Sequence, residues 1–338
     1  MLEKKHSLGL DGKGEAAEIS GLEKRKPLPL FRFLRAREMR IVAVVLAVSL
    51  ALSGATPHFL NSSNLTAVAI GFATDAIIAI AMTIVLVSGG FDLSVGSTLA
   101  LAGVVVAKLL HSGASIGIAI PATLAVAALV GAVNGLIITR FKVNPLITTL
   151  GMMSIGSSAT LVLSGGYPVS RLPQSFLFLG QGFIWGVPVA VLITLLLVII
   201  GDILLRRTRW LRLVYYVGGN EQAAALSGIP VERVRLLSYI FCSVMAGFAG
   251  IIATSRLSAA FPLAGTGTEL RVISACVIGG CSLSGGEGSI LGSLLGVLLM
   301  ALINNGLVLL NVSIYWQGIV SGLILIAAVT FDMLSRRR

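Results

Sequence analysis

The sequence predicts an all-α membrane protein that crosses the bilayer many times, and its composition and its apolar runs both indicate this fold class. Hydrophobic residues make up 56% of the 338 residues, charged residues make up 12%, and the mean hydropathy is +0.98. A soluble domain of this length does not need so much apolar surface. The apolar runs continue for about 18–22 residues each, which is the length of a helix that crosses the hydrocarbon core.

The apolar runs predict about ten transmembrane helices, and the basic residues orient them. Basic clusters that flank spans mark the cytoplasmic side. Ten of the 25 Lys and Arg residues precede Ile41, six lie in Arg206–Arg235 and three end the chain. Ten spans place all these clusters inside, with both termini cytoplasmic. The predicted spans cover residues 41–57, 65–88, 94–110, 116–138, 145–164, 187–205, 237–256, 270–283, 289–310 and 313–334.

The same pattern divides the chain into one membrane domain and two polar ends. Residues 1–40 form a basic cytoplasmic tail, residues 41–335 form the transmembrane domain with a cytoplasmic loop at 206–236, and residues 336–338 form the cytoplasmic C-terminus. Arg171, Arg256 and Arg271 are predicted exceptions on or near the outer side. We expect no cleavable signal peptide, because the first apolar run follows the polar tail.

Two similar glycine-rich segments interrupt the apolar runs. The first reads GGFDLSVGS at 89–97, and the second reads GGCSLSGGEGS at 279–289. Paired interruptions of this kind predict discontinuous helices of a transport pathway, so the eighth span is expected to be broken or re-entrant. Chance recurrence is the alternative in a chain with 39 glycines. Gly292 and Gly296, four residues apart, predict close packing of two helices.

Polar residues within or beside the spans are candidates for the translocation pathway. Asp92 and Ser94 are predicted to cap the following helix, or alternatively to contact the solute. Asp75 is predicted to face a water-filled path, or else to pair with a Ser, Thr or Asn on a neighbouring helix. Amides bind neutral polar solutes but more commonly hold helices together. The candidates are Asp75, Asp92, Ser94, Asn134, Ser282, Ser284, Asn304 and Asn305.

The stretch Arg206–Arg235 is a polar island between apolar runs and contains a short predicted helix. Asn220 is a capping residue and is followed by the strong helix formers of Glu221–Leu226. Ser227-Gly228 supplies the stop, and Pro230 suits the first turn of a new helix. A helix this short is barely stable alone in water. We therefore expect a partner protein to hold it at the membrane face.

Catalytic chemistry is not predicted for this chain. The three histidines lie in the tail or at span ends, and none has a partner at catalytic spacing. The three cysteines show neither disulfide nor metal-ligand spacing, so no metal site is expected. A G-x-x-x-x-G-K-[ST] phosphate loop is also missing from the sequence. The sequence therefore predicts a transport protein without a cofactor of its own, whose energy source lies outside this chain.

Four ordered motifs make the chain resemble the membrane permeases of ribose-type ABC importers. They are GGFDLSVGS at 89–97, VGGNEQAAALSGIPVERVR at 217–235, VIGGCSLSGGEGS at 277–289 and INNGLVLLNVSIYWQ at 303–317. The resemblance covers residues 41–335. It implies a bacterial inner-membrane permease, paired with a second copy or a sister permease. A periplasmic binding protein would deliver the solute, and a cytoplasmic ATPase would bind ATP and Mg²⁺.

The resemblance also implies a solute class and a coupling segment. The expected solute is small and neutral, namely a monosaccharide; the alternatives are autoinducer-2 or another non-sugar solute, or an ATP-independent carrier. Arg271 departs from the family pattern, and it is expected to pair with Glu269 or to alter the outer mouth. Arg233 and Arg235 are expected to face acidic groups of the ATPase. The coupling residues are Asn220, Glu221, Ala223, Ala224, Gly228, Ile229 and Arg233.

Overall fold

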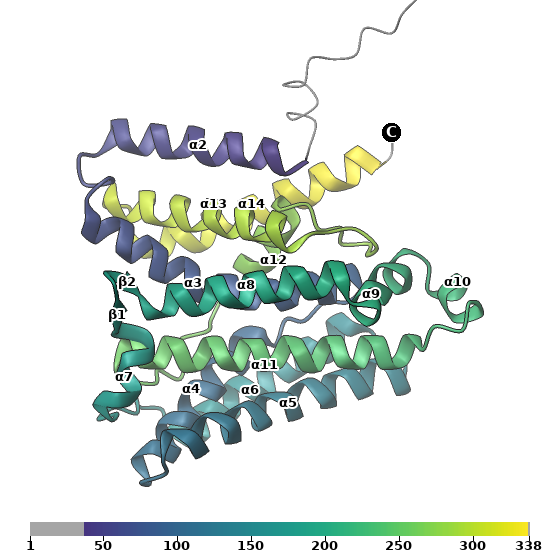
Figure 1. Ribbon diagram of the computed structural model, residues 1–338, viewed down its shortest axis with the longest axis horizontal. Helices are drawn as coiled ribbons and strands as arrows, with labels where there is room; N and C mark the ends of the chain where they lie inside the picture. The colour runs from purple at the N-terminus through teal and green to yellow at the C-terminus, as the bar shows by residue number, and fades with distance from the viewer. Residues whose placement is uncertain (1–36, 337–338) are drawn as a thin grey trace, which may run out of the picture.

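The computed structural model describes residues 37–336, and most of its helices run side by side as one bundle (Figure 1). The predicted tail up to residue 36 and the last two arginines lie outside the described residues. The elements are α2 Arg37–Ala55, α3 Ser62–Val87, α4 Val95–His111, α5 Ile116–Arg140, α6 Pro145–Ser164, α7 Gln174–Gln181, β1 Phe183–Ile184, β2 Val187–Pro188, α8 Val189–Arg207, α9 Arg209–Gly219, α10 Glu221–Leu226, α11 Val231–Leu257, α12 Thr268–Ile278, α13 Ile290–Leu309 and α14 Ile314–Arg336.

Capping residues in the sequence set several of these helix ends. The side chains of Asn61 and Asn144 accept backbone N–H bonds at the starts of α3 and α6, and Pro145 occupies the first turn of α6. These positions satisfy donors that a helix start leaves unpaired. Gly165 ends α6 in the left-handed conformation, with φ at 66°. Glycine is the usual residue at such a helix end because it lacks a Cβ.

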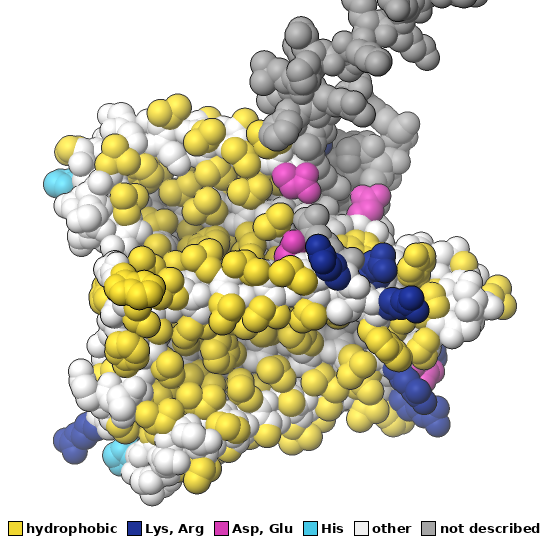
Figure 2. All heavy atoms as spheres, in the orientation of Figure 1, with side chains coloured by type: hydrophobic (Ala, Val, Ile, Leu, Met, Phe, Trp, Pro, Cys, Tyr) yellow, Lys and Arg dark blue, Asp and Glu magenta, His cyan; other side chains and the backbone are white. Residues whose placement is uncertain are grey.

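The core is built around α3 and α11. Every residue from Ala76 to Ser88 is buried, and α11 packs against α3, α4 and α5. A helix that is apolar on all sides is expected at such a central position. Outer helices such as α2 and α8 instead expose many leucine, valine and isoleucine side chains. Figure 2 shows these apolar side chains spread along the flank of the bundle, as a lipid-facing surface requires.

The described residues confirm a polytopic helical fold but not ten full crossings. Six helices are long and apolar enough to cross a membrane: α2, α3, α5, α6, α11 and α13. The helices α8 and α9 together give a seventh candidate, with a bend of 71° between them. The apolar helices Val95–His111 and Tyr315–Thr330 are shorter. The structure also contains one small antiparallel hairpin, β1–β2, which the sequence analysis did not predict.

The predicted eighth span, 270–283, differs most from the structure. Helix α12 has 11 residues, so it rises about 16 Å, roughly half of the 30 Å hydrocarbon core. Non-helical residues follow it up to α13, and a second non-helical segment separates α3 from α4. A hydropathy average over this stretch does not reveal that the helix ends at Ile278, nor that Cys281 and Ser282 are buried while Ser284 is exposed.

The α12–α13 contact brings two backbones close together. A Cβ atom added to Gly296 would collide with the backbone carbonyl oxygen of Ala275 in α12, and one added to Gly292 would collide with that of Gly279. The two glycines lie one turn apart on the same face of α13. Small residues at this spacing allow helices to approach closely in membranes.

The Gly296→Ala variant is expected to unfold at a lower temperature than the wild type. Overpacking of this kind costs about 1–3 kcal/mol, because the backbones must separate. The matched control is Gly322→Ala in α14, where an added Cβ meets nothing within 4 Å. Thermal unfolding in detergent measures both variants, and equal midpoints would contradict the packing account.

Candidate functional site

The polar island folds as two short helices, α9 and α10, that project from one end of the bundle (Figure 1). Helix α10 covers Glu221–Leu226, and the side chain of Asn220 accepts a hydrogen bond of 2.9 Å from the backbone N–H of Ala223. The structure therefore forms the predicted short helix with the predicted cap. The loop then reverses at Gly228, whose φ of 79° suits glycine best among the amino acids.

Most of the candidate coupling residues lie on the exposed surface of this projection. Ala223, Gly228 and Arg233 are exposed, whereas Ala224 is buried and Ile229 is half-buried. The side chain of Leu226, which the sequence analysis did not single out, is 92% exposed. A leucine this exposed on a projecting loop offers an apolar contact for a partner, although single exposed apolar residues are common on protein surfaces.

Arg235 connects α10 to the core of the molecule. Its guanidinium forms an ion pair of 2.8 Å with Glu221, and its Nε donates a hydrogen bond of 3.4 Å to the backbone oxygen of Ser88. From the sequence, Arg235 is expected to face acidic groups of the ATPase, and this expectation remains a prediction. Within this chain the acidic partner of Arg235 is Glu221. Glu221 and Arg235 are 14 positions apart in the sequence, and the turn at Gly228 between them brings them together.

The two glycine-rich segments meet each other beneath α9. The backbone N–H of Gly286 donates a hydrogen bond of 2.8 Å to the oxygen of Val87, at the end of α3. Gly218 of α9 lies against both partners, because an added Cβ would collide with Val87 and would lie 2.7 Å from the nitrogen of Gly286. Tyr215 of α9 also donates a hydrogen bond of 2.9 Å to the oxygen of Gly288. The non-helical segments and α9 therefore form one packed unit.

Three of the pathway candidates form a buried hydrogen-bond network. The Oδ1 of Asp92 accepts bonds of 2.9 Å from the backbone N–H and 2.6 Å from the hydroxyl of Ser94. The hydroxyl oxygen of Ser94 accepts a bond of 2.9 Å from the amide of Asn134 in α5. All three side chains are buried. This arrangement orders the turn before α4, but the side chain of Ser94 at the N-cap position accepts no hydrogen bond from the backbone of α4. The roles of Asp92 and Ser94 as helix caps or as solute contacts both remain predictions.

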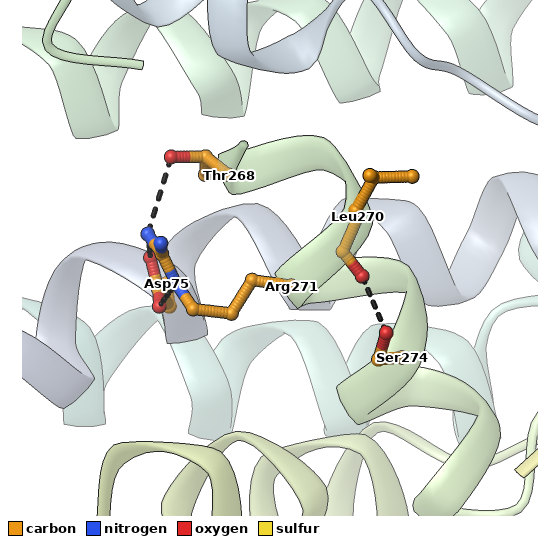
Figure 3. Close-up of polar contacts among 5 residues, drawn as sticks. All are labelled: Asp75, Thr268, Leu270, Arg271 and Ser274. Atoms are coloured by element: carbon orange, nitrogen blue, oxygen red, sulfur yellow. Dashed lines mark hydrogen bonds and ion pairs between the residues drawn. The ribbon is translucent and has the colours of Figure 1, made fainter. Parts of the chain in front are cut away.

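A second group of candidates lines a cavity of about 330 Å³ between α3, α11, α12 and α13. Arg271 of α12 contacts Asp75 of α3 with both ends of its guanidinium, at 2.6 Å and 3.0 Å (Figure 3). Arg271 also donates a hydrogen bond of 3.2 Å to the hydroxyl of Thr268. The predicted partners were different: Glu269 for Arg271, and a Ser, Thr or Asn for Asp75. Asp75 pairs with Arg271 because an isolated carboxylate at membrane depth is costly and an opposite charge compensates it.

Two amides complete this cavity, and their hydrogen bonding differs. Asn305 exchanges amide bonds of 3.1 Å and 2.7 Å with Asn64. The Oδ1 of Asn304 and the hydroxyl of Thr74 are buried and have no hydrogen-bond partner among the described residues. Arg256 lines the cavity as well. Arg256 is a functional candidate that sequence reasoning treated only as an exception to the charge rule, although intramembrane charges are a known signal.

The remaining two candidates lie apart from both groups. Ser282 is buried in the second glycine-rich segment, where its hydroxyl accepts a bond of 3.0 Å from the backbone N–H of Ser284. Ser284 is exposed. The eight pathway candidates therefore fall into three places rather than one. Within the described residues, no three His, Cys, Asp or Glu side chains gather as a metal site.

Comparison with known proteins gives consistent matches over most of the chain. The ribose import permease protein RbsC of Escherichia coli (strain K12) is 40% identical over 299 residues, which are 87% of this chain and 93% of that protein. RbsC of Bacillus subtilis (strain 168) is 41% identical over 278 residues, 82% of this chain and 86% of that protein. The L-arabinose transport system permease protein AraH of Escherichia coli (strain K12) is 38% identical over 294 residues, 87% of this chain and 89% of that protein.

The profile of one protein family also matches, and no solved structure does. The family is described as branched-chain amino acid transport system / permease component, and its match covers residues 64–329. Both this span and the coverage of the relatives exceed two thirds of the chain. The chain therefore belongs to this family of transport-system permeases.

Proposed function

We propose that this chain is the transmembrane permease of an ATP-driven ABC importer and that its solute is a monosaccharide. Relatives named for ribose and arabinose transport match it at 40% and 38% identity over 87% of its length. They favour a sugar over autoinducer-2, another non-sugar solute or an ATP-independent carrier. The family description names amino acids, but the individual full-length relatives are the more specific guide. Such a permease is a transport subunit and not an enzyme.

The proposed partners supply what this chain lacks. A cytoplasmic ATPase binds ATP and Mg²⁺, because the sequence has no phosphate loop. A periplasmic binding protein delivers the sugar, and a second copy or a sister permease completes a dimer. The α9–α10 end lies on the cytoplasmic side of the inner membrane, as do both termini. Basic side chains gather at this end in Figure 2, which supports the orientation.

The single observation that carries the coupling proposal is the exposed face of α10. The helix is held by its Asn220 cap and by the Glu221–Arg235 ion pair, and it projects with Leu226 and Ala223 uncovered. A short helix with small side chains fits a groove on a partner protein. Gly228 in the loop after α10 and Arg233 in the first turn of α11 are also exposed. We assign this face to the ATPase.

The link from α10 to the membrane runs through Arg235 and through α9. Arg235 bonds both Glu221 of α10 and the backbone of Ser88, and Gly218 of α9 touches both non-helical segments. A displacement of α10 by the ATPase would therefore reach the ends of α3, α4, α12 and α13. This arrangement provides a physical route from ATP hydrolysis to the membrane-embedded helices.

We further propose that the two glycine-rich segments are the breaks of discontinuous helices, as in other transporters. Non-helical backbone at membrane depth is tolerated where the protein itself satisfies its polar groups. Here the backbone N–H of Cys281 donates a hydrogen bond of 2.9 Å to the backbone oxygen of Cys276. The N–H of Ser282 donates another of 2.9 Å to the backbone oxygen of Glu287. The half-length of α12 also supports this proposal. Counted with α4, α8, α12 and α14, the six full-length spans would give ten crossing or half-crossing segments.

We propose that the cavity lined by Asp75, Asn304 and Asn305 forms part of the solute path. Its volume of about 330 Å³ lies in the range of small-molecule sites, roughly 300–1,000 Å³. It presents both donors, on Arg256 and Arg271, and an unpaired acceptor on Asn304. Such mixed polarity suits a polyhydroxylated neutral solute. Ser282 and Ser284 are proposed for the inner end of the path, whereas Asp92, Ser94 and Asn134 keep a structural role.

The Leu226→Glu variant is expected to lose most sugar uptake, because a charge would replace the apolar contact with the ATPase. Leu226→Met, which preserves an apolar side chain of similar volume, is the matched control and is expected to retain uptake. Both variants should purify like the wild type, since the side chain is 92% exposed. Uptake and copurification of the ATPase are measured in reconstituted vesicles. Wild-type behaviour of Leu226→Glu in both assays would refute the docking assignment.

The Asn304→Leu variant is expected to be more stable than the wild type but slower in uptake. Replacing an unsatisfied buried acceptor by an apolar group of similar shape regains about 1 kcal/mol. It also removes a polar contact for the solute. Asn305→Leu provides the contrast, because it breaks the amide pair with Asn64 and should lower stability. Thermal unfolding and vesicle uptake give the two readouts, and unchanged uptake with Asn304→Leu would exclude Asn304 from the path.

A further inference from the structure

The β1–β2 hairpin lies at the end of the molecule opposite α10, directly before α8 (Figure 1). Phe183 pairs with Pro188, and Ile184 pairs with Val187. The backbone N–H of Val189, the first residue of α8, donates a hydrogen bond of 2.9 Å to the oxygen of Gly182. The base of the hairpin is therefore tied to the first turn of α8.

The two-residue turn of this hairpin contains an unusual residue. Trp185 has a φ of 51° and Gly186 has a φ of 78°, so both central residues are left-handed, as a type I′ turn requires. Asn-Gly and Asp-Gly are the usual pairs in such a turn, and a bulky residue with positive φ is a genuine outlier. Backbone conformation alone does not favour tryptophan here. An outlier of this kind indicates that the side chain itself has a role.

The side chains of the hairpin are apolar and uncovered. Trp185 is 98% exposed, and Phe183, Ile184 and Val187 are 54%, 39% and 37% exposed. The surrounding sequence contains no charged residue from 172 to 201. An interface with a soluble binding protein would have a polar rim around its apolar centre. An exposed apolar stretch without charged residues of its own instead suits lipid.

This apolar surface continues along α8. Leu195, Leu196 and Ile199 are exposed on that helix, which belongs to the candidate span formed by α8 and α9. Figure 2 shows the apolar side chains at the position of the hairpin and along α8 as one continuous band. Because the hairpin continues the lipid-facing surface of α8 at the end of that helix, we expect it to lie in the region of the lipid headgroups.

We propose that the Trp185 hairpin is a lipid anchor that lies in the headgroup region of the leaflet opposite α10. The indole ring lies among the headgroups, where tryptophan is enriched because one part of the ring is apolar and its N–H is polar. Phe183, Ile184 and Val187 face the upper acyl chains. Because the hairpin is tied to Val189, the anchor fixes the depth at which α8 enters the bilayer.

The direct test uses the fluorescence of Trp185 as the single tryptophan. The chain has three tryptophans, and Trp210 and Trp316 are exposed, so replacing both by Phe isolates Trp185. The full-length variant is placed in phosphatidylcholine nanodiscs whose acyl chains carry bromine near the headgroup or near the terminal methyl. We expect loss of most of the emission with bromine near the headgroup, and a smaller loss with bromine near the methyl end. A variant that also carries Trp185→Phe gives the blank.

Two results would overturn the anchor. Emission that neither brominated lipid quenches, but that aqueous iodide quenches fully, would place the indole in water. Emission that only the sugar-loaded periplasmic binding protein shields from iodide would assign the hairpin to protein docking instead.

A second variant separates anchoring from hairpin stability. Trp185→Asn provides a residue that the turn prefers, so the hairpin is expected to fold and the unfolding midpoint in detergent to be unchanged or higher. In lipid vesicles the same variant is expected to unfold at a lower temperature than the wild type. An equal decrease in both media would show a role in the hairpin fold alone. No decrease in vesicles would exclude anchoring.

Discussion

The contact of α9 with the two non-helical segments is the constraint on which the rest of the structure depends. Gly286 bonds to Val87 directly beneath Gly218, where no side chain has room. Helix α3 ends there, α4 begins after the first segment, and α12 and α13 flank the second. The ends of four helices of the bundle therefore meet at the short helix α9. Several backbone N–H groups of the two segments, such as those of Gly90, Cys281 and Ser282, donate to backbone oxygens of the protein. Such internal partners are the condition for irregular structure at membrane depth.

The few charges at membrane depth follow the same principle of local compensation. Asp92 is satisfied on one oxygen by Ser94, and Asp75 is paired with Arg271. The first arrangement is fully buried and orders a turn, whereas the second borders a cavity and leaves the two side chains 17% and 30% exposed. A buried ion pair is weak evidence for stability, because desolvation offsets the attraction. Both arrangements leave buried polar atoms without a hydrogen-bond partner among the described residues: Thr74 Oγ1 and Asn304 Oδ1 at the cavity, and Asp92 Oδ2 and Asn134 Oδ1 in the buried network.

The sequence was sufficient to predict the features that depend on local pattern. Apolar runs predicted the helical membrane fold, and Asn220 with its helix formers predicted the α10 cap. It was not sufficient for features that depend on long-range contact: Asp75 and Arg271 are 196 positions apart, so no local spacing indicates their pairing. Hydropathy also overestimated the length of α12, because the glycine-rich segment that follows it is similar in composition to a membrane helix. The Trp185 hairpin was missed since Trp-Gly is not a usual turn signal.

The proposed coupling requires that Arg235 transmit the movement of α10 to the non-helical segment after α3. Arg235→Lys tests it most directly, because lysine keeps the charge near Glu221 but lacks the planar fork that also reaches Ser88. The measurement is sugar-stimulated ATP hydrolysis in vesicles that hold the permease, its ATPase and its binding protein, with the exposed Arg212→Lys as control. We expect that the ATPase still binds to Arg235→Lys while stimulation by sugar is lost. Full stimulation in Arg235→Lys would show that Arg235 does not carry the coupling.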